Sequence, residues 1–227
     1  MIDGILLIDK EKGITSYDVI RKVKKVLGRE QKIGHAGTLD PLASGLLILL
    51  LGKATKSMNT FHTYNKVYEV VGELGFATDT QDMEGKVINK DEKGFKPDIK
   101  DIQDLIEKNF LGDISQTPPN YSAKKIQGQK AYDLAREGKQ FTIEKKDIHI
   151  SQYEVFEYAY PIVKCKIVCS TGTYVRTLIH DLGIKLNTYA TVIDLRRVSI
   201  GDFNISEAIS STELENSEEL LRRVINI

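Results

Sequence analysis

The sequence predicts a single α+β domain over residues 1–227. Short apolar or alternating runs typical of strands are interspersed with runs whose apolar residues recur at the helical period. No linker rich in glycine and serine separates two halves of the chain. With 227 residues, 41% of them hydrophobic, the chain is long enough to bury a sizeable core. These observations favour one mixed domain without internal repeats.

The expected elements of the first half follow from these patterns. Ser16 is the expected N-cap of a helix that ends at Gly28. The apolar residues of this helix follow the helical period: Val19, Ile20, Val23, Val26 and Leu27. The other expected elements are strands over 4–8, 46–51 and 66–74, helices over 54–63 and 98–110, and a turn-rich loop over 78–85.

The second half begins where Pro118 and Pro119 interrupt the regular pattern. The segment over 121–138 is basic, which indicates an exposed arm or insertion. Beyond it we expect strands over 141–150, 152–159 and 162–170, and an acidic helix over 214–224. One further helix is marked by its apolar residues: Val175, Leu178, Ile179, Leu182 and Leu186.

The overall charge gives the protein no long-range attraction for a polyanion, because Lys plus Arg and Asp plus Glu each number 32. The distribution is uneven, since residues 21–32 are rich in Lys and Arg and contain only one acid, Glu30. Two interpretations stay open for this stretch. It forms a basic patch for nucleic acid, or it is an ordinary solvated helix face.

The two cysteines, Cys165 and Cys169, occupy one face of an expected strand without His or carboxylate partners at metal-ligand spacing. We expect buried free thiols, and a reducing cytosol as the location. The N-terminus has no signal-peptide pattern, and the longest apolar stretch, 46–51, is too short for a membrane span. The run from Gly45 to Lys53 lacks the spacing of a phosphate-binding loop, so a strand is expected there.

A glycine-rich loop over 34–45 contains Asp40, the best candidate for a functional residue. One interpretation makes Asp40 a helix N-cap, with Pro41 at the first helical position. The other makes it functional, because His35, Thr38 and several glycines surround it. The loop alone leaves both interpretations open.

Two further residues are candidates to join Asp40. Tyr68 lies in Lys-Val-Tyr-Glu-Val, and Arg176 lies in Gly-Thr-Tyr-Val-Arg-Thr, where a turn enters a helix. Taken singly, each fits an ordinary core tyrosine or surface arginine. Because all three lie on segments marked by glycine, they could converge on one pocket.

A series of motifs occurs in a fixed order over residues 4–203. The first are Gly-Ile-Leu-Leu-Ile-Asp-Lys-Glu-Lys-Gly-Ile-Thr-Ser and the loop at 34–45 with its continuation Leu-Leu-Ile-Leu-Leu-Leu-Gly-Lys-Ala-Thr-Lys. The tyrosine and arginine motifs, Thr-Asp-Thr-Gln-Asp, Gln-Thr-Pro-Pro-Asn-Tyr-Ser-Ala-Lys-Lys and Leu-Arg-Arg complete the set. The chain thereby resembles the TruB-type pseudouridine synthases, which convert uridine 55 in the T-loop of transfer RNA.

The resemblance implies the pseudouridine synthase fold, with a central mixed, mainly antiparallel sheet flanked by helices. It implies one catalytic domain over 1–227, with a basic thumb-like insertion over 118–142 that grips the RNA. The chain resembles the bacterial stand-alone type, with a short acidic helical tail over 205–227 in place of the usual C-terminal RNA-binding domain. A second departure is Asp9-Lys10-Glu11, where the family usually has Asp-Lys-Pro, which adds a carboxylate near Lys12.

The resemblance also implies residue roles. Asp40 matches the catalytic aspartate, Tyr68 the active-site tyrosine, and Arg176 the arginine that pairs with the aspartate. His35, Tyr174 and Leu195 match positions that contact the RNA or its flipped uridine. A carboxylate can attack and later leave, as an isomerisation of this kind requires. No step moves electrons or phosphate, so neither a metal nor an organic cofactor is expected.

The expected partner is the T-arm of transfer RNA, bound in the cytoplasm by a monomer that needs no membrane and no protein partner. Two alternatives remain. One is a non-catalytic module that binds the T-arm and helps RNA to fold. The other is a guide-dependent synthase that modifies ribosomal RNA, although the start of the motifs at residue 4 and the insertion favour the stand-alone type.

Overall fold

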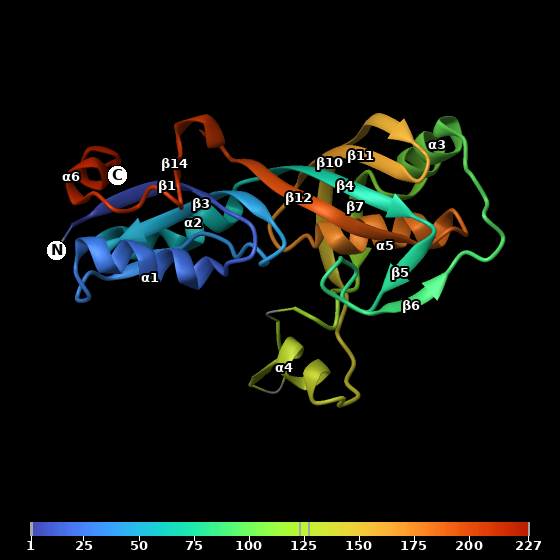
Figure 1. Cartoon of the computed structure of the whole chain (residues 1–227), viewed down its shortest axis with the longest axis horizontal. Coiled ribbons are helices and arrows are strands. Elements are labelled where there is room, and N and C mark those ends of the chain that lie inside the picture. The colour runs from blue at the N-terminus through green and yellow to red at the C-terminus, as the bar shows by residue number, and fades with distance from the viewer. Residues whose placement is uncertain (1, 123, 127, 227) are drawn as a thin grey trace. The chain divides into compact units, whose positions relative to one another are not determined.

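The computed structural model describes residues 2–122, 124–126 and 128–226 (Figure 1). It divides into two compact units, which we describe separately. Unit 1 comprises Met1–Glu69 and Leu195–Ile227, and unit 2 comprises Val70–Asp194. Strands β4 (Lys66–Leu74) and β12 (Ala190–Ile200) cross the boundary, so each contributes to both units.

Unit 1 contains a mixed sheet. Its strands are β1 (Gly4–Lys10), β2 (Ile33–His35), β3 (Ser44–Leu51), β13 (Phe203–Asn204) and β14 (Ile209–Ser210), with parts of β4 and β12. Its helical elements are α1 (Ser16–Leu27), η1 (Gly52–Ser57), α2 (Met58–Thr63), η2 (Ile205–Glu207) and α6 (Ser217–Arg222). Strands β14, β1, β3 and β12 are neighbours in that order, and only the β1–β3 pair among them is antiparallel.

The core of unit 1 forms around β3, in which every residue from Ser44 to Leu51 is buried. Side chains alternate between the two faces of a strand, so β3 is covered on both faces. On one face, Ile5 and Leu7 of β1 pack with Ile48 of β3 and Phe61 of α2. The strand expected over 46–51 is therefore confirmed.

Unit 2 contains an antiparallel set of strands. Its strands are β5 (Phe76–Thr78), β6 (Val87–Lys90), β7 (Gly112–Gln116), β8 (Lys125–Ile126), β9 (Gln129–Lys130), β10 (Lys146–Ala159) and β11 (Ile162–Cys169), with parts of β4 and β12. Its helices are α3 (Ile99–Asn109), α4 (Ala131–Arg136) and α5 (Val175–Lys185). Strands β4, β11, β10 and β7 are neighbours in that order, and β10 is antiparallel to both β11 and β7. With the mixed sheet of unit 1, this confirms the α+β prediction.

Cys165 and Cys169 are buried free thiols, as expected from their spacing on one face of β11. Burial raises the pKa of Cys165 to about 12, so its thiol stays protonated.

The segment over 118–142 contains α4 and the short β8–β9 pair, and Figure 1 shows α4 extending away from the strands of unit 2. Within α4, the buried apolar residues are Ala131 and Leu134. Its outline fits an insertion, whereas its role as a thumb that grips RNA stays a prediction, as does the single-domain organisation over 1–227.

Several expected boundaries were wrong. Thr15, not Ser16, is the N-cap of α1, because the Thr15 side chain accepts a hydrogen bond from the Asp18 N–H in a capping box. The two strands expected over 141–150 and 152–159 are one strand, β10, that starts at Lys146. A bulge between Ile150 and Gln152 shifts the pairing of β10 with β11 without ending the strand.

Other differences concern length and short elements. The helix expected over 54–63 is the 3₁₀ element η1 followed by α2, and the last helix covers only Ser217–Arg222. The strands that were not expected are β2, β5, β6, β7, β8, β9, β12, β13 and β14. Among the described residues, no helix has the length and apolar character needed to cross a membrane.

Candidate active site

The loop around Asp40 is irregular backbone between β2 and β3. No helix begins at Pro41, so the interpretation of Asp40 as a helix N-cap is wrong. The Asp40 carbonyl instead accepts a hydrogen bond from the Ala43 N–H at 3.1 Å, and the Asp40 residue is half-buried. The tight turn after Asp40 leads directly into the buried strand β3.

Helix α1 and the turn before it anchor this loop on either side of Asp40. The Ser16 hydroxyl accepts from the Leu39 N–H at 2.9 Å and lies 3.1 Å from the Leu39 carbonyl. The Gly13 N–H donates to the Pro41 carbonyl at 2.8 Å. Because Thr15 caps the helix, the Ser16 hydroxyl is available for Leu39.

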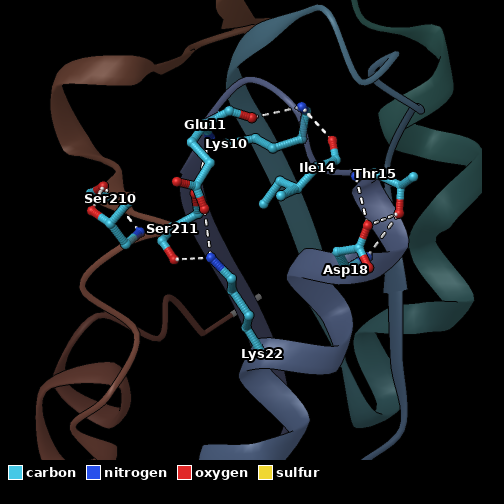
Figure 2. Close-up of polar contacts among 9 residues, drawn as sticks. Lys10, Glu11, Ile14, Thr15, Asp18, Lys22, Ser210 and Ser211 are labelled. Carbon is cyan, nitrogen blue, oxygen red and sulfur yellow. Dashed lines mark hydrogen bonds and ion pairs between the residues drawn. The ribbon is translucent and has the colours of Figure 1, made fainter.

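The turn that holds Pro41 is itself shaped by buried Lys10, whose ammonium donates to the carbonyls of Glu11 and Ile14, each at 2.8 Å (Figure 2). The Glu11 carboxylate pairs with Lys22 of α1 at 2.5 Å, not with the adjacent Lys12. The Glu11 N–H donates to the Ser211 hydroxyl at 2.9 Å. A proline at position 11 would lack this N–H, so the Asp-Lys-Glu departure creates a tie to the C-terminal segment.

Arg197 of β12 lies beneath the loop in unit 1 and is almost fully buried. Its Nε donates to the Leu46 carbonyl at 2.8 Å and its Nη2 to the Gly37 carbonyl at 3.1 Å. Burial lowers the pKa of His35 below its usual range, and the charges of Arg197 and then His62 lower it further. His35 is therefore neutral at pH 7.

Tyr68 and Leu195 are the other candidates in unit 1. Tyr68 is half-buried in the part of β4 that belongs to this unit. Leu195 is buried at the start of the unit 1 part of β12, two residues before Arg197, so both side chains lie on one face of the strand. His35, Asp40, Tyr68 and Leu195 thus all belong to unit 1.

Arg176 and Tyr174 belong to unit 2. Arg176 lies at the start of α5 and is 4% exposed. Its guanidinium forms an ion pair with Asp82 at 3.1 Å and donates to the carbonyls of Thr80 at 2.5 Å and Tyr121 at 3.1 Å. The ion pair between Asp40 and Arg176 that the resemblance implies stays a prediction.

Asp82 fixes the turn that receives Arg176. Its carboxylate accepts from the Thr80 hydroxyl at 2.6 Å and the Glu84 N–H at 3.0 Å. The neighbouring Gln81 has a positive φ of 65° and its carbonyl accepts from the Val192 N–H at 3.1 Å. The Thr-Asp-Thr-Gln-Asp motif is therefore a rigid support for the arginine.

Tyr174 is the residue before α5, and Gln116 of β7 fixes its backbone. The Gln116 side-chain oxygen accepts from the Tyr174 N–H at 2.8 Å, and its amide nitrogen donates to the Tyr174 carbonyl at 3.0 Å. This pair of hydrogen bonds fixes the Tyr174 backbone at the point where the chain enters α5.

The sequence reasoning missed four supporting residues: Ser16, Asp82, Gln116 and Arg197. Each lies inside one of the motifs that carry the resemblance, and membership of such a motif is the signal that could have identified it. None of them has a spacing that identifies its partner, because each acts across the fold on a backbone group or an ion pair. Among the described residues, no cluster of three or more His, Cys, Asp or Glu could hold a metal ion. The expectation that the reaction needs no metal stays a prediction.

Two family models match the chain. The model described as TruB family pseudouridylate synthase, N-terminal domain, matches residues 24–175. The model described as tRNA pseudouridylate synthase B C-terminal domain matches residues 176–226. The second match begins at Arg176 and includes the segment that we expected to be a short tail.

Solved structures support the fold. A Cbf5–Nop10–Gar1 complex matches 98% of this chain and 60% of the solved chain, with a TM-score of 0.73 and 26% identity. An H/ACA ribonucleoprotein bound to a substrate RNA containing 2'-deoxyuridine matches 92% of this chain and 51% of the solved chain, with a TM-score of 0.67 and 27% identity. The chain thus spans less than two thirds of either solved chain, and the expected pseudouridine synthase fold is confirmed.

Curated relatives are more similar. A tRNA pseudouridine synthase B from Endomicrobium trichonymphae is 44% identical over 99% of this chain and 96% of its own length. One from Clostridium kluyveri is 42% identical over 100% of this chain and 76% of its own length. A family model over more than half of the chain and relatives of this similarity show that the chain belongs to the TruB family of pseudouridylate synthases.

Proposed function

We propose that the protein isomerises uridine 55 in the T-loop of transfer RNA to pseudouridine, with Asp40 as the nucleophile. The observation that carries this proposal is a half-buried aspartate on a backbone-anchored loop, in a member of a pseudouridylate synthase family. In the reaction, the C–N glycosidic bond breaks and uracil rotates. A bond then forms between C1′ and C5, the hydrogen on C5 leaves as a proton, and N1 takes up a proton, so the product is an isomer of uridine.

Asp40 suits this chemistry because a carboxylate can act as a nucleophile and leave again. Arg176 would hold Asp40 ionised and aim it, since a guanidinium favours the charged form of a nearby carboxylate. The contacts of Arg176 with Asp82 and two backbone carbonyls hold its guanidinium in place, which supports this role. Tyr68 would stack on the target uracil.

The other candidates would manage the flipped base. Extruding a nucleotide costs a few kcal/mol of stacking, so the enzyme must stabilise the flipped state. His35, which is neutral at pH 7, would fill the space left in the RNA. Leu195 would form an apolar wall of the pocket, and Tyr174 would contact the RNA.

The substrate proposal rests on the relatives, which are named tRNA pseudouridine synthase B and are 42–44% identical to the chain. The guide-dependent alternative is weaker, because the solved H/ACA relatives are only 26–27% identical. The basic segment over 121–138 would grip the T-arm through phosphate contacts. We propose a monomer that acts in the cytoplasm without a protein partner, metal or cofactor.

Tritium release tests the reaction directly. The protein is incubated with an unmodified transfer RNA transcript carrying tritium at uracil C5, and a second transcript has cytidine at position 55. We expect tritium release from the first transcript and no release from the second. No release by the native protein would contradict catalysis and favour the non-catalytic RNA-binding alternative.

Asp40→Asn tests the nucleophile, because asparagine keeps the shape and loses the charge. We expect no detectable release, with binding of transfer RNA retained. Asp113→Asn is the matched control, since its side chain is 90% exposed and pairs with His149 at the surface. Release by Asp40→Asn at the rate of the control would exclude Asp40 as nucleophile.

A comparison of substrates tests the RNA contacts. Because the basic segment over 121–138 is the proposed grip on the T-arm, the T-arm should be the main determinant. We expect a T-arm minihelix to react nearly as well as whole transfer RNA. A large preference for the intact molecule would contradict this part of the proposal.

A further inference from the structure

We propose that Arg197 is a positioning residue that fixes the catalytic loop by tying together its two ends beneath Asp40. This inference rests on the proposed function of Asp40, but its geometry stands on contacts within unit 1 alone. The residue lies on β12, far from the loop in sequence, and its side chain reaches the loop from the strand that pairs with β3.

The two acceptors of Arg197 lie on opposite sides of Asp40 in the sequence. The Gly37 carbonyl, before Asp40, receives Nη2 at 3.1 Å, and the Leu46 carbonyl, after Asp40, receives Nε at 2.8 Å. A planar guanidinium presents these donors in a fixed fork, so the two carbonyls are held at a set separation. The path of the chain between them is thereby restricted.

The burial of Arg197 indicates that the hydrogen bonds are its purpose. The residue is 1% exposed, and within the described residues no carboxylate lies at ion-pair distance from it. A buried charge is costly unless its donors are satisfied. An apolar side chain would fill the same space without this cost, but it could not donate to the carbonyls of Gly37 and Leu46.

The loop is shaped to admit Arg197. Gly45 pairs with Arg197 between β3 and β12 and has a φ of +109°. A Cβ on Gly45 would lie 2.7 Å from the Arg197 backbone nitrogen, which is closer than packed atoms allow. A Cβ on Gly37 would lie 3.5 Å from Nη1, in ordinary contact. The glycine at 45 therefore permits the close approach of the two backbones.

Arg197 has a second measurable effect on the loop. Its charge is one of the causes, after burial, that lower the pKa of His35, and His62 is the third. Removing the charge at 197 should raise the pKa of His35, whereas a lysine should leave it nearly unchanged. This gives a readout of the charge at position 197 that is independent of the rate.

The main test uses two variants. Arg197→Lys keeps the charge but loses the fork, and Arg197→Met loses both. For each, we expect a single-turnover rate about 100-fold lower, the size of effect that a misplaced catalytic group produces. The Kd for transfer RNA should stay within about twofold of the native value, since placement of the nucleophile is changed and not the binding surface.

Histidine NMR titration accompanies the kinetics. The pKa of His35 should rise in Arg197→Met and stay near the native value in Arg197→Lys. Arg196→Lys is the matched control, because Arg196 is the adjacent arginine and pairs with Asp9 at 2.6 Å, while its contact with the loop, at 3.3 Å, is with the Ser44 hydroxyl and not with a backbone carbonyl. It should retain the native rate. Native rates in both Arg197 variants, or a loss confined to RNA binding, would overturn the proposal.

A second anchor keeps the test decisive if the Arg197 variants fail to fold. Ser16→Ala removes the hydroxyl that holds Leu39 and changes no charge. We expect faster hydrogen exchange at the Leu39 amide and a single-turnover rate about 10-fold lower, because the nucleophile's loop is less restricted. A native rate in this variant would overturn the idea that backbone anchors set the position of Asp40.

The outcomes separate this inference from the proposed function. If the native protein releases no tritium, the proposed function fails, while hydrogen exchange of the Leu39 amide in the Arg197 and Ser16 variants still reports whether these residues anchor the loop. If the native protein is active and neither Arg197→Lys nor Ser16→Ala is slower, only the positioning role fails.

Discussion

Asp40 in unit 1 and Arg176 in unit 2 are held in different ways. Asp40 is positioned through the backbone of its loop, by Ser16 and Arg197 among others. Arg176 is positioned through its own side chain, by Asp82 and two backbone carbonyls. In the first case the anchors hold neighbouring peptide groups, and in the second they hold the functional group itself.

The difference suits the two proposed roles. A nucleophile must be placed at the substrate, and bonds to the rest of its loop fix the path of the chain on either side of it. An arginine that only aims and stabilises a charge can be fixed by its own donors, because a guanidinium has five N–H groups. Changes to the loop backbone should therefore affect Asp40, whereas changes to side-chain partners should affect Arg176.

The largest effect is expected for Gly45→Ala. The new Cβ would meet the backbone of Arg197 at 2.7 Å from its nitrogen, and alanine rarely adopts the φ of +109° found there. We expect loss of activity by more than about 1,000-fold, because the start of β3 and the loop must move. Tritium release and thermal unfolding measure the effect.

Gly94→Ala is the matched control for backbone strain. Gly94 also has a positive φ, of +62°, but nothing lies within 4 Å of the position of its Cβ. We expect this variant to lose about 1 kcal/mol of stability and to keep native activity. Equal activity in the two variants would show that the close approach at Gly45 has no role in placing Asp40.

The next effect is expected for Asp82→Asn, which tests the side-chain anchoring of Arg176. Asparagine keeps an oxygen for Thr80 and Glu84 but loses the charge that pairs with the buried guanidinium. Breaking a buried pair costs about 3–5 kcal/mol of stability. We also expect a single-turnover rate about 100-fold lower at native RNA affinity, because Arg176 loses its fixed orientation. A native rate in a folded variant would contradict this support.

The sequence predicted Asp40, Tyr68 and Arg176 as candidates because their residue types and motifs are specific. It did not predict how they are held. In the sequence, Arg197 is one of two adjacent arginines in Leu-Arg-Arg. Only the folded structure shows that Arg197 is buried against Gly37 and Leu46. The strand that contains it, β12, was missed altogether.

Elements with strong local patterns were predicted well, and those that depend on partners were not. The all-apolar β3 and the helical period of α1 were visible in the sequence. The N-cap of α1 was misplaced by one residue, because Thr15 and Ser16 are both good caps and Leu39 decides between them. Strand β10 was divided at Ser151, because a bulge cannot be distinguished from a break by alternation alone.

A smaller effect is expected at Asp181, on α5, the helix that contains Arg176. Burial raises the pKa of Asp181 to about 6, and Lys185 only partly offsets this. Between about pH 4 and 6 the folded protein binds more protons at this site than the unfolded chain, so stability falls as the pH rises. Asp181→Asn should remove this dependence and stabilise the protein at pH 7 by about 2 kcal/mol.

Urea unfolding of the native protein and Asp181→Asn at several pH values checks this. The difference in unfolding free energy should shrink as the pH falls from 7 to 4. Lys185→Gln is a companion variant, and it should raise the pKa of Asp181 further, because the opposing charge is removed. A difference that does not change with pH would mean that Asp181 keeps an ordinary pKa.

The smallest effect is expected for Glu11→Gln, at the tie between the first turn and the C-terminal segment. The hydrogen bond from Lys22 holds the pKa of Glu11 below its usual range. The pair therefore stabilises the protein above the usual pKa of a glutamate, and this stabilisation is lost as the pH falls through the lowered pKa. Because the pair is partly exposed, its loss should cost less than about 1 kcal/mol at pH 7.

Activity of Glu11→Gln sharpens the comparison between the two kinds of anchor. The Glu11 carboxylate lies on the turn that holds Pro41, but the hydrogen bonds that shape this turn come from Lys10 and Gly13 (Figure 2). The rate should therefore stay native while the small stability difference vanishes at acidic pH. A rate loss as large as that of Ser16→Ala would mean that the C-terminal segment also helps to position Asp40, through a side chain and not only through the loop backbone.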